Sequence, residues 1–240
     1  MPLRTRAEQM LRNSTPARRM RTDVALERLS ALPGAVRMLD AGCDVGLLSM
    51  AIARRFPTWT IDAVDVNDEM LERGRRWAAE EGLSRISYRH ADVTTDLPEA
   101  TYDVVVALEC LTVIPDLDGA LAGMAGALVP GGRFVAHVPD RDWQPVLPGS
   151  AGEWETAVRH GFSPDELAER LDAHGLRVTW TRATMRTPLH AAQELYDRSL
   201  AASLKVKLAL HPLHVTAAAC ERHGLAFGPA RGLYVEAVRR

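Results

Sequence analysis

Strand-like and helix-like segments alternate from Val36 to about Val138, and this alternation constrains the fold more than any other feature of the sequence. Alternation of this kind predicts a doubly wound α/β sheet of mostly parallel strands with helices on both faces. Residues 103–108 and 133–138 are almost wholly apolar, which is typical of strands covered on both sides. The expected segments, strand and helix in turn, are 35–39, 47–56, 59–66, 68–82, 86–93 with 102–108, 117–129 and 133–138.

The C-terminal half continues this pattern less regularly. A capping box at residues 163–166 predicts the start of a helix, which we expect to end at Gly175. Residues 176–180 and 232–240 then predict a sixth and a seventh strand. The stretch between them is too long for a hairpin and has helical periodicity.

The chain is long enough for one sizeable core, since its 240 residues are 47% hydrophobic. We expect an N-terminal helical arm over residues 1–34 and one α/β domain over residues 35–240. Within that domain we expect a helical cap inserted at about residues 187–224.

Composition narrows the functional classes. The net charge of −2 gives no sign of nucleic-acid binding, and no apolar run reaches the roughly 18 residues of a membrane span. The three cysteines, Cys43, Cys110 and Cys220, are far apart, which argues against a disulfide framework or a structural metal site. With no apolar secretory segment at the N-terminus, we expect a cytoplasmic protein that holds no metal.

The turn between the first strand and the first helix contains Gly42, Asp44 and Gly46. A glycine turn before a helix suits close approach of a ligand, but this spacing is not the GxGxxG fingerprint of dinucleotide-binding proteins. The next strand ends in Asp65, where a carboxylate accepts hydrogen bonds from ribose hydroxyls. The pattern predicts a ribose-containing ligand without a diphosphate.

Five stretches in register resemble the successive motifs of class I S-adenosylmethionine-dependent methyltransferases. They are "VRMLDAGCDVG", "IDAVDVNDEML", "HADVTTDLP", "YDVVVALECLTVIPD" and "LVPGGRFVAHVP", and they cover about residues 35 to 140. The later "FSPDELAERLDAHGLRV" resembles the helix and sixth strand of small-molecule members. The resemblance implies a seven-stranded Rossmann-like sheet with a reversed last strand, and S-adenosyl-L-methionine as the cofactor, with S-adenosyl-L-homocysteine as the product.

The resemblance also implies a role for each matching position. Asp40 would help to hold the methionine amino group, Asp65 the ribose hydroxyls and Asp92 the adenine amino group. The resemblance further implies backbone contacts from around Ala41, Gly42 and Gly46 to the methionine end and from near Ala107 to the sulfonium, with Val66, Met70 and Val93 around adenine. Asp40 and Asp92 can also serve only to accept turn N–H groups, and Val66 and Met70 can be ordinary core residues.

Asp44 stands where most members of this family carry glycine. If the position has a positive φ, aspartate tolerates it better than most residues but worse than glycine. The carboxylate can also cap the helix that begins near Gly46. The favoured interpretation is a harmless substitution; the alternatives are repulsion of the cofactor carboxylate and a special role.

A methyl group on a sulfonium is already activated, so the protein mainly has to align donor and acceptor. A base is needed only if the accepting atom must lose a proton early. The candidates are His137 and Glu109, at the ends of the fifth and fourth strands, and His160. For His137 a hydrogen-bonded structural role is the favoured alternative, and Cys110 is expected to be a small buried residue.

The acceptor pocket has weaker signals. Trp143 and Trp154 flank a loop that can close over the pocket, where their aromatic faces can hold an organic acceptor or a cation; the alternative is that both are packing residues. Tyr196 and Leu200 begin an apolar helical face that Pro212 should end, with a second short helix to about Cys220. This face packs on the sheet domain or on a homodimer partner, or it forms a lid over the acceptor.

A cluster of arginines near the N-terminus is expected to be a solvated, partly mobile arm, or else to bind an anionic acceptor. Its members are Arg4, Arg6, Arg12, Arg18, Arg19 and Arg21.

The sequence therefore predicts transfer of a methyl group to oxygen or nitrogen of a small organic acceptor, of a secondary-metabolite or lipid-like kind. One alternative is a member that binds the cofactor and catalyses a non-methylating reaction such as a cyclisation. The other is a cofactor-binding protein without turnover. RNA methylation lacks motifs and a strongly basic domain.

Overall fold

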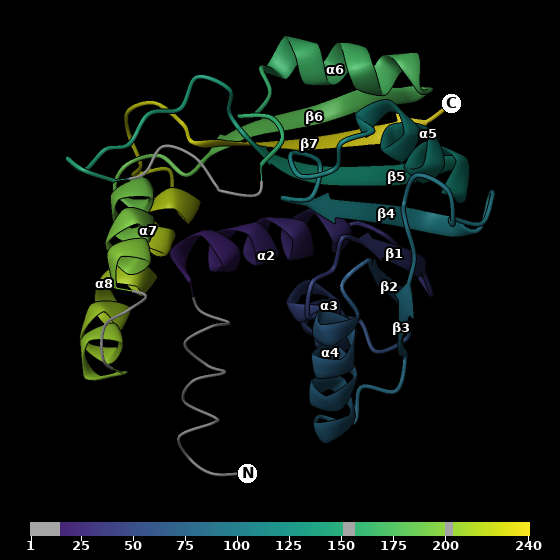
Figure 1. Ribbon diagram of the computed structural model, residues 1–240, viewed down its shortest axis with the longest axis horizontal. Helices are drawn as coiled ribbons and strands as arrows, with labels where there is room; N and C mark the ends of the chain where they lie inside the picture. Colours follow the sequence, from purple (N-terminus) through teal and green to yellow (C-terminus); the bar gives the residue numbers. More distant parts are fainter. Residues whose placement is uncertain (1–14, 151–156, 200–203) are drawn as a thin grey trace.

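The computed structural model describes residues 15–150, 157–199 and 204–240, which form one seven-stranded sheet with helices on both faces (Figure 1). The strands are β1 (Arg37–Ala41), β2 (Thr60–Asp65), β3 (Ile86–His90), β4 (Tyr102–Leu108), β5 (Leu128–Pro139), β6 (Leu176–Thr184) and β7 (Gly232–Arg239). The helices are α2 (Pro16–Leu29), α3 (Leu47–Arg55), α4 (Asp68–Glu80), α5 (Leu117–Ala127), α6 (Pro164–Ala173), α7 (Leu189–Arg198) and α8 (Leu204–Arg222).

The strand order is β3-β2-β1-β4-β5-β7-β6, and β7 runs antiparallel to both of its neighbours. The doubly wound sheet with a reversed last strand is thus confirmed. Two strands are longer than the sequence predicted: β5 begins at Leu128, inside the expected helix, and β6 continues to Thr184. Both extensions are paired, with β4 and β7 respectively, so the neighbouring strands satisfy backbone groups that local pattern alone does not assign.

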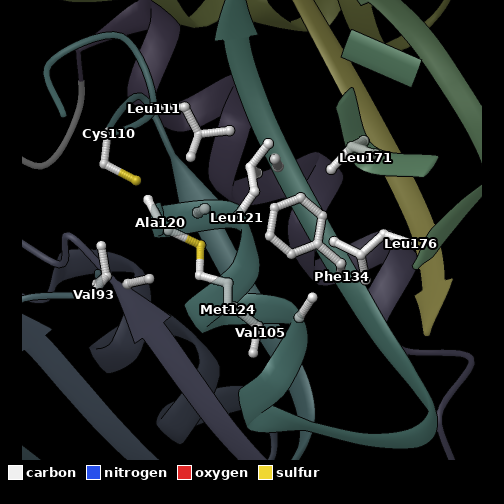
Figure 2. Close-up of a cluster of buried hydrophobic side chains, with 14 of the residues drawn as sticks. Val93, Val105, Cys110, Leu111, Ala120, Leu121, Met124, Phe134, Leu171 and Leu176 are labelled. Atoms are coloured by element: carbon white, nitrogen blue, oxygen red, sulfur yellow. The ribbon is translucent and has the colours of Figure 1, made fainter. Parts of the chain in front are cut away.

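The core has one layer on each side of the sheet. On one side, α5 and α6 contribute Leu121, Met124 and Leu171, which pack on Val105 and Phe134 of the sheet (Figure 2). On the other side lie α2, α3, α7 and α8, whose apolar residues share a second buried cluster with the opposite faces of β1, β4 and β5. Burial on both faces explains the uninterrupted apolar sequence of the central strands.

The expected helix boundaries are confirmed where a cap was visible in the sequence. Asn67 accepts a hydrogen bond from the N–H of Met70 at the start of α4, and Gly82 follows this helix with φ 70°. Ser163 caps α6 in the same way, and Gly175 follows that helix with φ 76°. Such local signals act through the backbone of a few neighbouring residues and need no tertiary context.

The prediction that Pro212 ends a helix is wrong. The helix α7 ends at Arg198, and α8, which begins at Leu204, continues through Pro212 to Arg222. An interior proline removes one backbone hydrogen bond, and Pro212 is exposed, so the loss falls on the solvent side of the helix. Across the described ranges, we find no helix with the length and apolar content needed to cross a membrane.

The helix α2 lies across the sheet and against α7 and α8 (Figure 1). The Tyr234 hydroxyl donates to the carbonyl of Arg21 at 2.7 Å, and Arg28 pairs with Glu236 at 2.8 Å. The expectation of a solvated arm is therefore wrong for Arg21, whose side chain is 13% exposed, whereas the Arg18 side chain keeps 35% exposure. Arg4, Arg6 and Arg12 lie outside the described residues.

Candidate functional site

A first cavity, of about 490 Å³, lies at the carboxyl ends of β1, β2 and β4. Three carboxylates reach its wall from successive strand ends: Asp40 from β1, Asp65 from β2 and Asp92 just after β3. Parallel strands place their carboxyl ends at one edge of the sheet, so residues far apart in the sequence meet there. The wall also includes Gly42, Cys43, Asp44, Leu47, Leu48, Val66, Val93, Leu108 and Cys110.

Asp40 is the most deeply buried of these carboxylates, at 3% exposure. Burial raises its pKa to about 6, and repulsion from Asp65 and Asp44 acts in the same direction. A hydrogen bond of 2.6 Å from the Ser49 hydroxyl partly offsets both effects. Near neutral pH the group is therefore mostly a carboxylate, which can pair with a cation placed in the cavity.

The Asp65 carboxylate is held by two backbone donors. Its Oδ2 accepts from the N–H of Asp44 at 2.8 Å, and its Oδ1 accepts from the N–H of Asn67 at 2.9 Å. Each oxygen keeps a lone pair for a further donor, so the group is oriented but not saturated.

Asp44 has φ 53°, so the position does have the left-handed conformation that glycine adopts without a steric penalty. The sequence suggested that the Asp44 side chain caps α3, but it does not. The N-cap of that helix is Gly46, and no side chain caps it. Instead the carboxylate is half exposed and lies 3.9 Å from Arg18 of α2. Gly42 is more demanding, because a Cβ there would lie 2.5 Å from the Cβ of Cys110.

Four of the expected cofactor residues do not reach the cavity wall. The side chains of Ala41 and Ala107 lie in the core, and the part of the wall that β4 contributes begins at Leu108. Gly46 packs behind the loop, where a Cβ would lie 2.4 Å from the Tyr88 hydroxyl. Met70 is half-buried in the first turn of α4, and Val66, before the helix, lines the cavity instead.

A second cavity, of about 710 Å³, adjoins the first. Arg21 and Glu109 belong to the walls of both. The second wall also includes Thr112, His137, Trp143, Arg159, His160, Met185, Gln193, Glu194, Asp197, Arg198 and Arg231. Two adjoining cavities of this size can hold two small molecules side by side, with a shared boundary at Arg21 and Glu109.

Glu109 stands at this boundary with φ 67°, an uncommon conformation for a glutamate. Burial would raise its pKa, but the charge of Arg21 at 3.6 Å and the contact with His137 outweigh that effect and lower the pKa to about 2. A carboxylate this acidic is a poor general base.

His137 has the hydrogen-bonded structural arrangement that the sequence left as the favoured alternative. It is 1% exposed; its Nδ1 contacts Glu109, and its Nε2 lies 2.8 Å from the Thr184 hydroxyl. Burial lowers its pKa despite the neighbouring carboxylate. A neutral ring donates to Glu109 from Nδ1 and accepts from Thr184 at Nε2, which leaves no nitrogen for a substrate.

The remaining acceptor-side candidates separate into two groups. Trp143 and His160 line the second cavity and stack with ring centroids 5.8 Å apart. Tyr196 does not line it: this residue is buried edge-on against His214, while Gln193 and Asp197 of the same helix face the cavity. Trp154 and Leu200 lie outside the described residues.

Several cavity residues carry no recognisable sequence signal, above all Arg159, Glu194 and Arg231. Arg21 belongs to the basic cluster near the N-terminus, which marked it as cationic but not as inward-facing. Cys110 is buried, as expected, and burial raises the pKa of its thiol to about 12, so it is not a thiolate nucleophile.

Comparison with known proteins agrees with this architecture. A family model described as a methyltransferase domain matches residues 38–132. Trans-aconitate 2-methyltransferase of Methylobacterium radiotolerans is 32% identical over 145 residues, which are 58% of this chain and 54% of that protein. Ubiquinone biosynthesis O-methyltransferase of Hahella chejuensis is 29% identical over 194 residues, 74% of this chain and 77% of that protein.

Among solved structures, the [4+2]-cyclase SpnF superposes with a TM-score of 0.66 at 22% identity, covering 91% of this chain and 79% of that one. At this identity the similarity concerns the fold alone. The chain spans about half the length of the first curated relatives it matches. The sheet order, the methyltransferase domain matched over residues 38–132 and these relatives support a class I S-adenosylmethionine-dependent methyltransferase.

Proposed function

We propose that this protein transfers a methyl group from S-adenosylmethionine to a small organic acceptor. The observation that carries the proposal is the pair of adjoining cavities, the first with carboxylates at three strand ends and the second with aromatic and charged walls. Methyl transfer requires the donor and the acceptor to meet in line, and the boundary at Arg21 and Glu109 is where the two cavities meet.

In this proposal S-adenosylmethionine occupies the first cavity. Asp40 holds the methionine amino group, Asp65 the ribose hydroxyls and Asp92 the adenine amino group, while Val66 and Val93 pack on the adenine. The Asp92 carboxylate already accepts from the N–H and the hydroxyl of Thr94, which orients it. Arg18 and Arg21 reach the same cavity from α2, so this helix covers the bound cofactor.

The reaction needs little from the protein beyond alignment. The acceptor lone pair forms the new bond to the methyl carbon, and the electrons of the broken S–CH₃ bond stay on sulfur as S-adenosylhomocysteine. Because the pKa of Glu109 is low and both ring nitrogens of His137 have hydrogen-bond partners, we propose that neither residue acts as general base. His160, on the wall of the second cavity, is the remaining candidate. A hydroxyl or amine acceptor would otherwise pass its proton to water.

The second cavity supports a small acceptor of biosynthetic origin. The stacked rings of Trp143 and His160 suit a flat or apolar skeleton, and the arginines suit polar substituents. Curated relatives are named as O-methyltransferases of ubiquinone biosynthesis and as trans-aconitate methyltransferases, and both acceptors are small organic molecules.

Product analysis tests the activity. The protein is incubated with S-adenosylmethionine and a panel of hydroxylated, amino and carboxylated aromatic acceptors, and S-adenosylhomocysteine is quantified by mass spectrometry. Release that depends on an acceptor supports the transferase. Conversion of an acceptor with no release indicates the cyclase-type alternative, while tight cofactor binding with no product from any panel member indicates a binding protein.

Calorimetry tests the cofactor site independently. Asp65→Ala should weaken S-adenosylmethionine binding by about 1.5–3 kcal/mol, the cost of losing a charged hydrogen-bond partner. Asp62→Ala is the matched control, because Asp62 lies on the same strand but pairs with Arg37 and Tyr102 away from the cavity. Equal affinities in the Asp65 variant and the wild type would remove Asp65 from the site.

A further inference from the structure

We propose that Arg231 binds a carboxylate group of the methyl acceptor, so that the substrates of the second cavity are organic carboxylic acids. This inference rests on the proposed function, since it names the class of molecule that the second cavity accepts. Three observations support it: Arg231 is buried, the carboxylates around it have other partners, and backbone hydrogen bonds hold its main chain in place.

Arg231 is 8% exposed, and its side chain lines the second cavity. Its guanidinium lies 4.3 Å from the centroid of the Trp143 ring. In the described part of the chain, no oxygen accepts a hydrogen bond from this guanidinium; only its backbone groups are bonded, to Thr184 and Asp140. Burial of a guanidinium without a hydrogen-bond acceptor costs free energy. A bound anion would supply the missing acceptor.

The nearby carboxylates are engaged elsewhere. Glu109 is shared by Arg21 and His137. Glu194 accepts from the N–H groups of Val146 and Leu147 at 2.8 and 2.7 Å.

Asp197, the remaining carboxylate on this wall, accepts from the Gln193 side chain at 2.8 Å. Burial lowers the pKa of Arg231, and the attraction of Asp197, Glu109 and Glu194 does not cancel this effect. The protein's own carboxylates thus do not fully offset the desolvation of the guanidinium charge.

The other arginines of the wall differ from Arg231 in this respect. Arg159 donates to the carbonyls of Leu111 and Ile114 and so fastens the loop after β4. Arg198 donates to the hydroxyl of Ser150 at 3.0 Å and to carbonyls of the same loop. Both have structural partners, whereas the Arg231 guanidinium lines the cavity over the Trp143 ring and has no hydrogen-bond acceptor among the described residues.

The backbone holds Arg231 in place at the start of β7. Its N–H donates to the carbonyl of Thr184, and its carbonyl accepts from the N–H of Asp140 at 2.8 Å. The next residue is Gly232, where a Cβ would lie 2.6 Å from the His137 ring, so the strand approaches His137 closely. A preorganised planar donor set of this kind matches the two oxygens of a carboxylate.

A single guanidinium on Trp143 suits a monoanion, which favours a carboxylate over a phosphate ester. A carboxylate is already ionised at neutral pH and requires no protein base for its recognition. This agrees with a cavity in which Glu109 and His137 are both unavailable as bases.

The test is calorimetric binding of 2-naphthoate, 2-naphthamide and 2-naphthyl phosphate to the ligand-free protein. We expect wild type to bind 2-naphthoate about tenfold or more tighter than the neutral amide, the effect of a charge-assisted hydrogen bond. Arg231→Gln should abolish that preference. Arg177→Gln, which removes the same charge from an exposed position on β6, should keep it.

Thermal melting and S-adenosylmethionine affinity check that the Arg231→Gln protein is folded. Should it not fold, Arg231→Lys serves instead: charge without the planar donor set should reduce the preference several-fold. An unchanged preference in the folded variant, or a wild type that binds acid and amide equally or not at all, overturns the inference. Tighter binding of the phosphate than of the carboxylate overturns the choice of a carboxylate. The titrations use no turnover, so a failed methyl-transfer assay leaves their outcome readable.

Discussion

The guanidinium of Arg21 lies 3.6 Å from the carboxylate of Glu109, and the two side chains form the wall shared by both cavities. Arg21 comes from α2 and Glu109 from the end of β4, so this pair joins the N-terminal helix to the edge of the sheet where the strands end. Both side chains are 13% exposed, so solvent screens the pair only weakly.

Removing the carboxylate of this pair should be costly. Glu109→Gln leaves Arg21 buried without its ion-pair partner, and we expect a loss of about 3 kcal/mol in the free energy of unfolding. Urea denaturation at pH 7 measures it, with the exposed Glu99→Gln as control. A loss below about 0.5 kcal/mol would show that the pair contributes no more than a surface salt bridge.

The same carboxylate predicts a pH dependence. Its folded pKa of about 2 lies below the ordinary value of 4.5, so its contribution to stability is complete above pH 4.5 and is lost as the pH falls toward 2. The shift corresponds to about 3 kcal/mol. Wild type should therefore lose more stability between pH 5 and pH 2 than Glu109→Gln does; parallel curves would contradict the assignment.

Asp40 should behave in the opposite way. Its folded pKa of about 6 lies above the ordinary 3.8, so the stability linked to it is complete below pH 3.8 and is lost as the pH rises through 6. Asp40→Asn should therefore raise the melting temperature of the ligand-free protein at pH 8. It should also weaken cofactor binding, if Asp40 holds the methionine amino group.

Cofactor affinity itself should follow the ionisation of Asp40. Wild type should bind S-adenosylmethionine about tenfold more weakly at pH 5 than at pH 8, because only about a tenth of Asp40 is ionised one unit below its pKa. Calorimetry at the two pH values should show a much smaller change for Asp40→Asn. An equal change in both proteins would assign the pH dependence to another group.

Asp44 can be tested with two substitutions that differ in one property. Asp44→Gly removes both the charge and the positive-φ penalty, whereas Asp44→Asn removes the charge alone. We expect both variants to bind S-adenosylmethionine within about 1 kcal/mol of wild type, because the carboxylate is half exposed and lies near Arg18. Tighter binding by both would show repulsion of the cofactor carboxylate; weaker binding by both would show a direct role.

Tyr196 should matter for stability and not for acceptor choice. Its ring is 7% exposed against His214, so Tyr196→Ala should cost about 3 kcal/mol. Gln193→Ala, one turn earlier on the same helix and on the cavity wall, is the comparison that should change the acceptor KM. Thermal melting and steady-state kinetics separate the two. A raised acceptor KM in the folded fraction of the Tyr196 variant would show that Tyr196 contributes to the acceptor pocket.

Local sequence was sufficient for the features that depend on a few neighbouring residues. The alternation of apolar segments predicted the doubly wound sheet, and the caps at Asn67 and Ser163 predicted two helix starts, because these signals act through the adjacent backbone. The positions of Asp40, Asp65 and Asp92 at strand ends brought them to one cavity wall, because a parallel sheet aligns its carboxyl ends.

Tertiary structure decided what depends on contacts between distant segments. Nothing near Arg21 or Arg231 in the sequence shows that α2 turns one arginine toward Glu109, or that β7 presents the other to the second cavity. The structural roles of His137 and Tyr196 likewise depend on their contacts with Thr184 and His214, which come from other elements. Charge and hydrogen-bond partners fix the role of a buried polar side chain, and those partners are set only when the chain has packed.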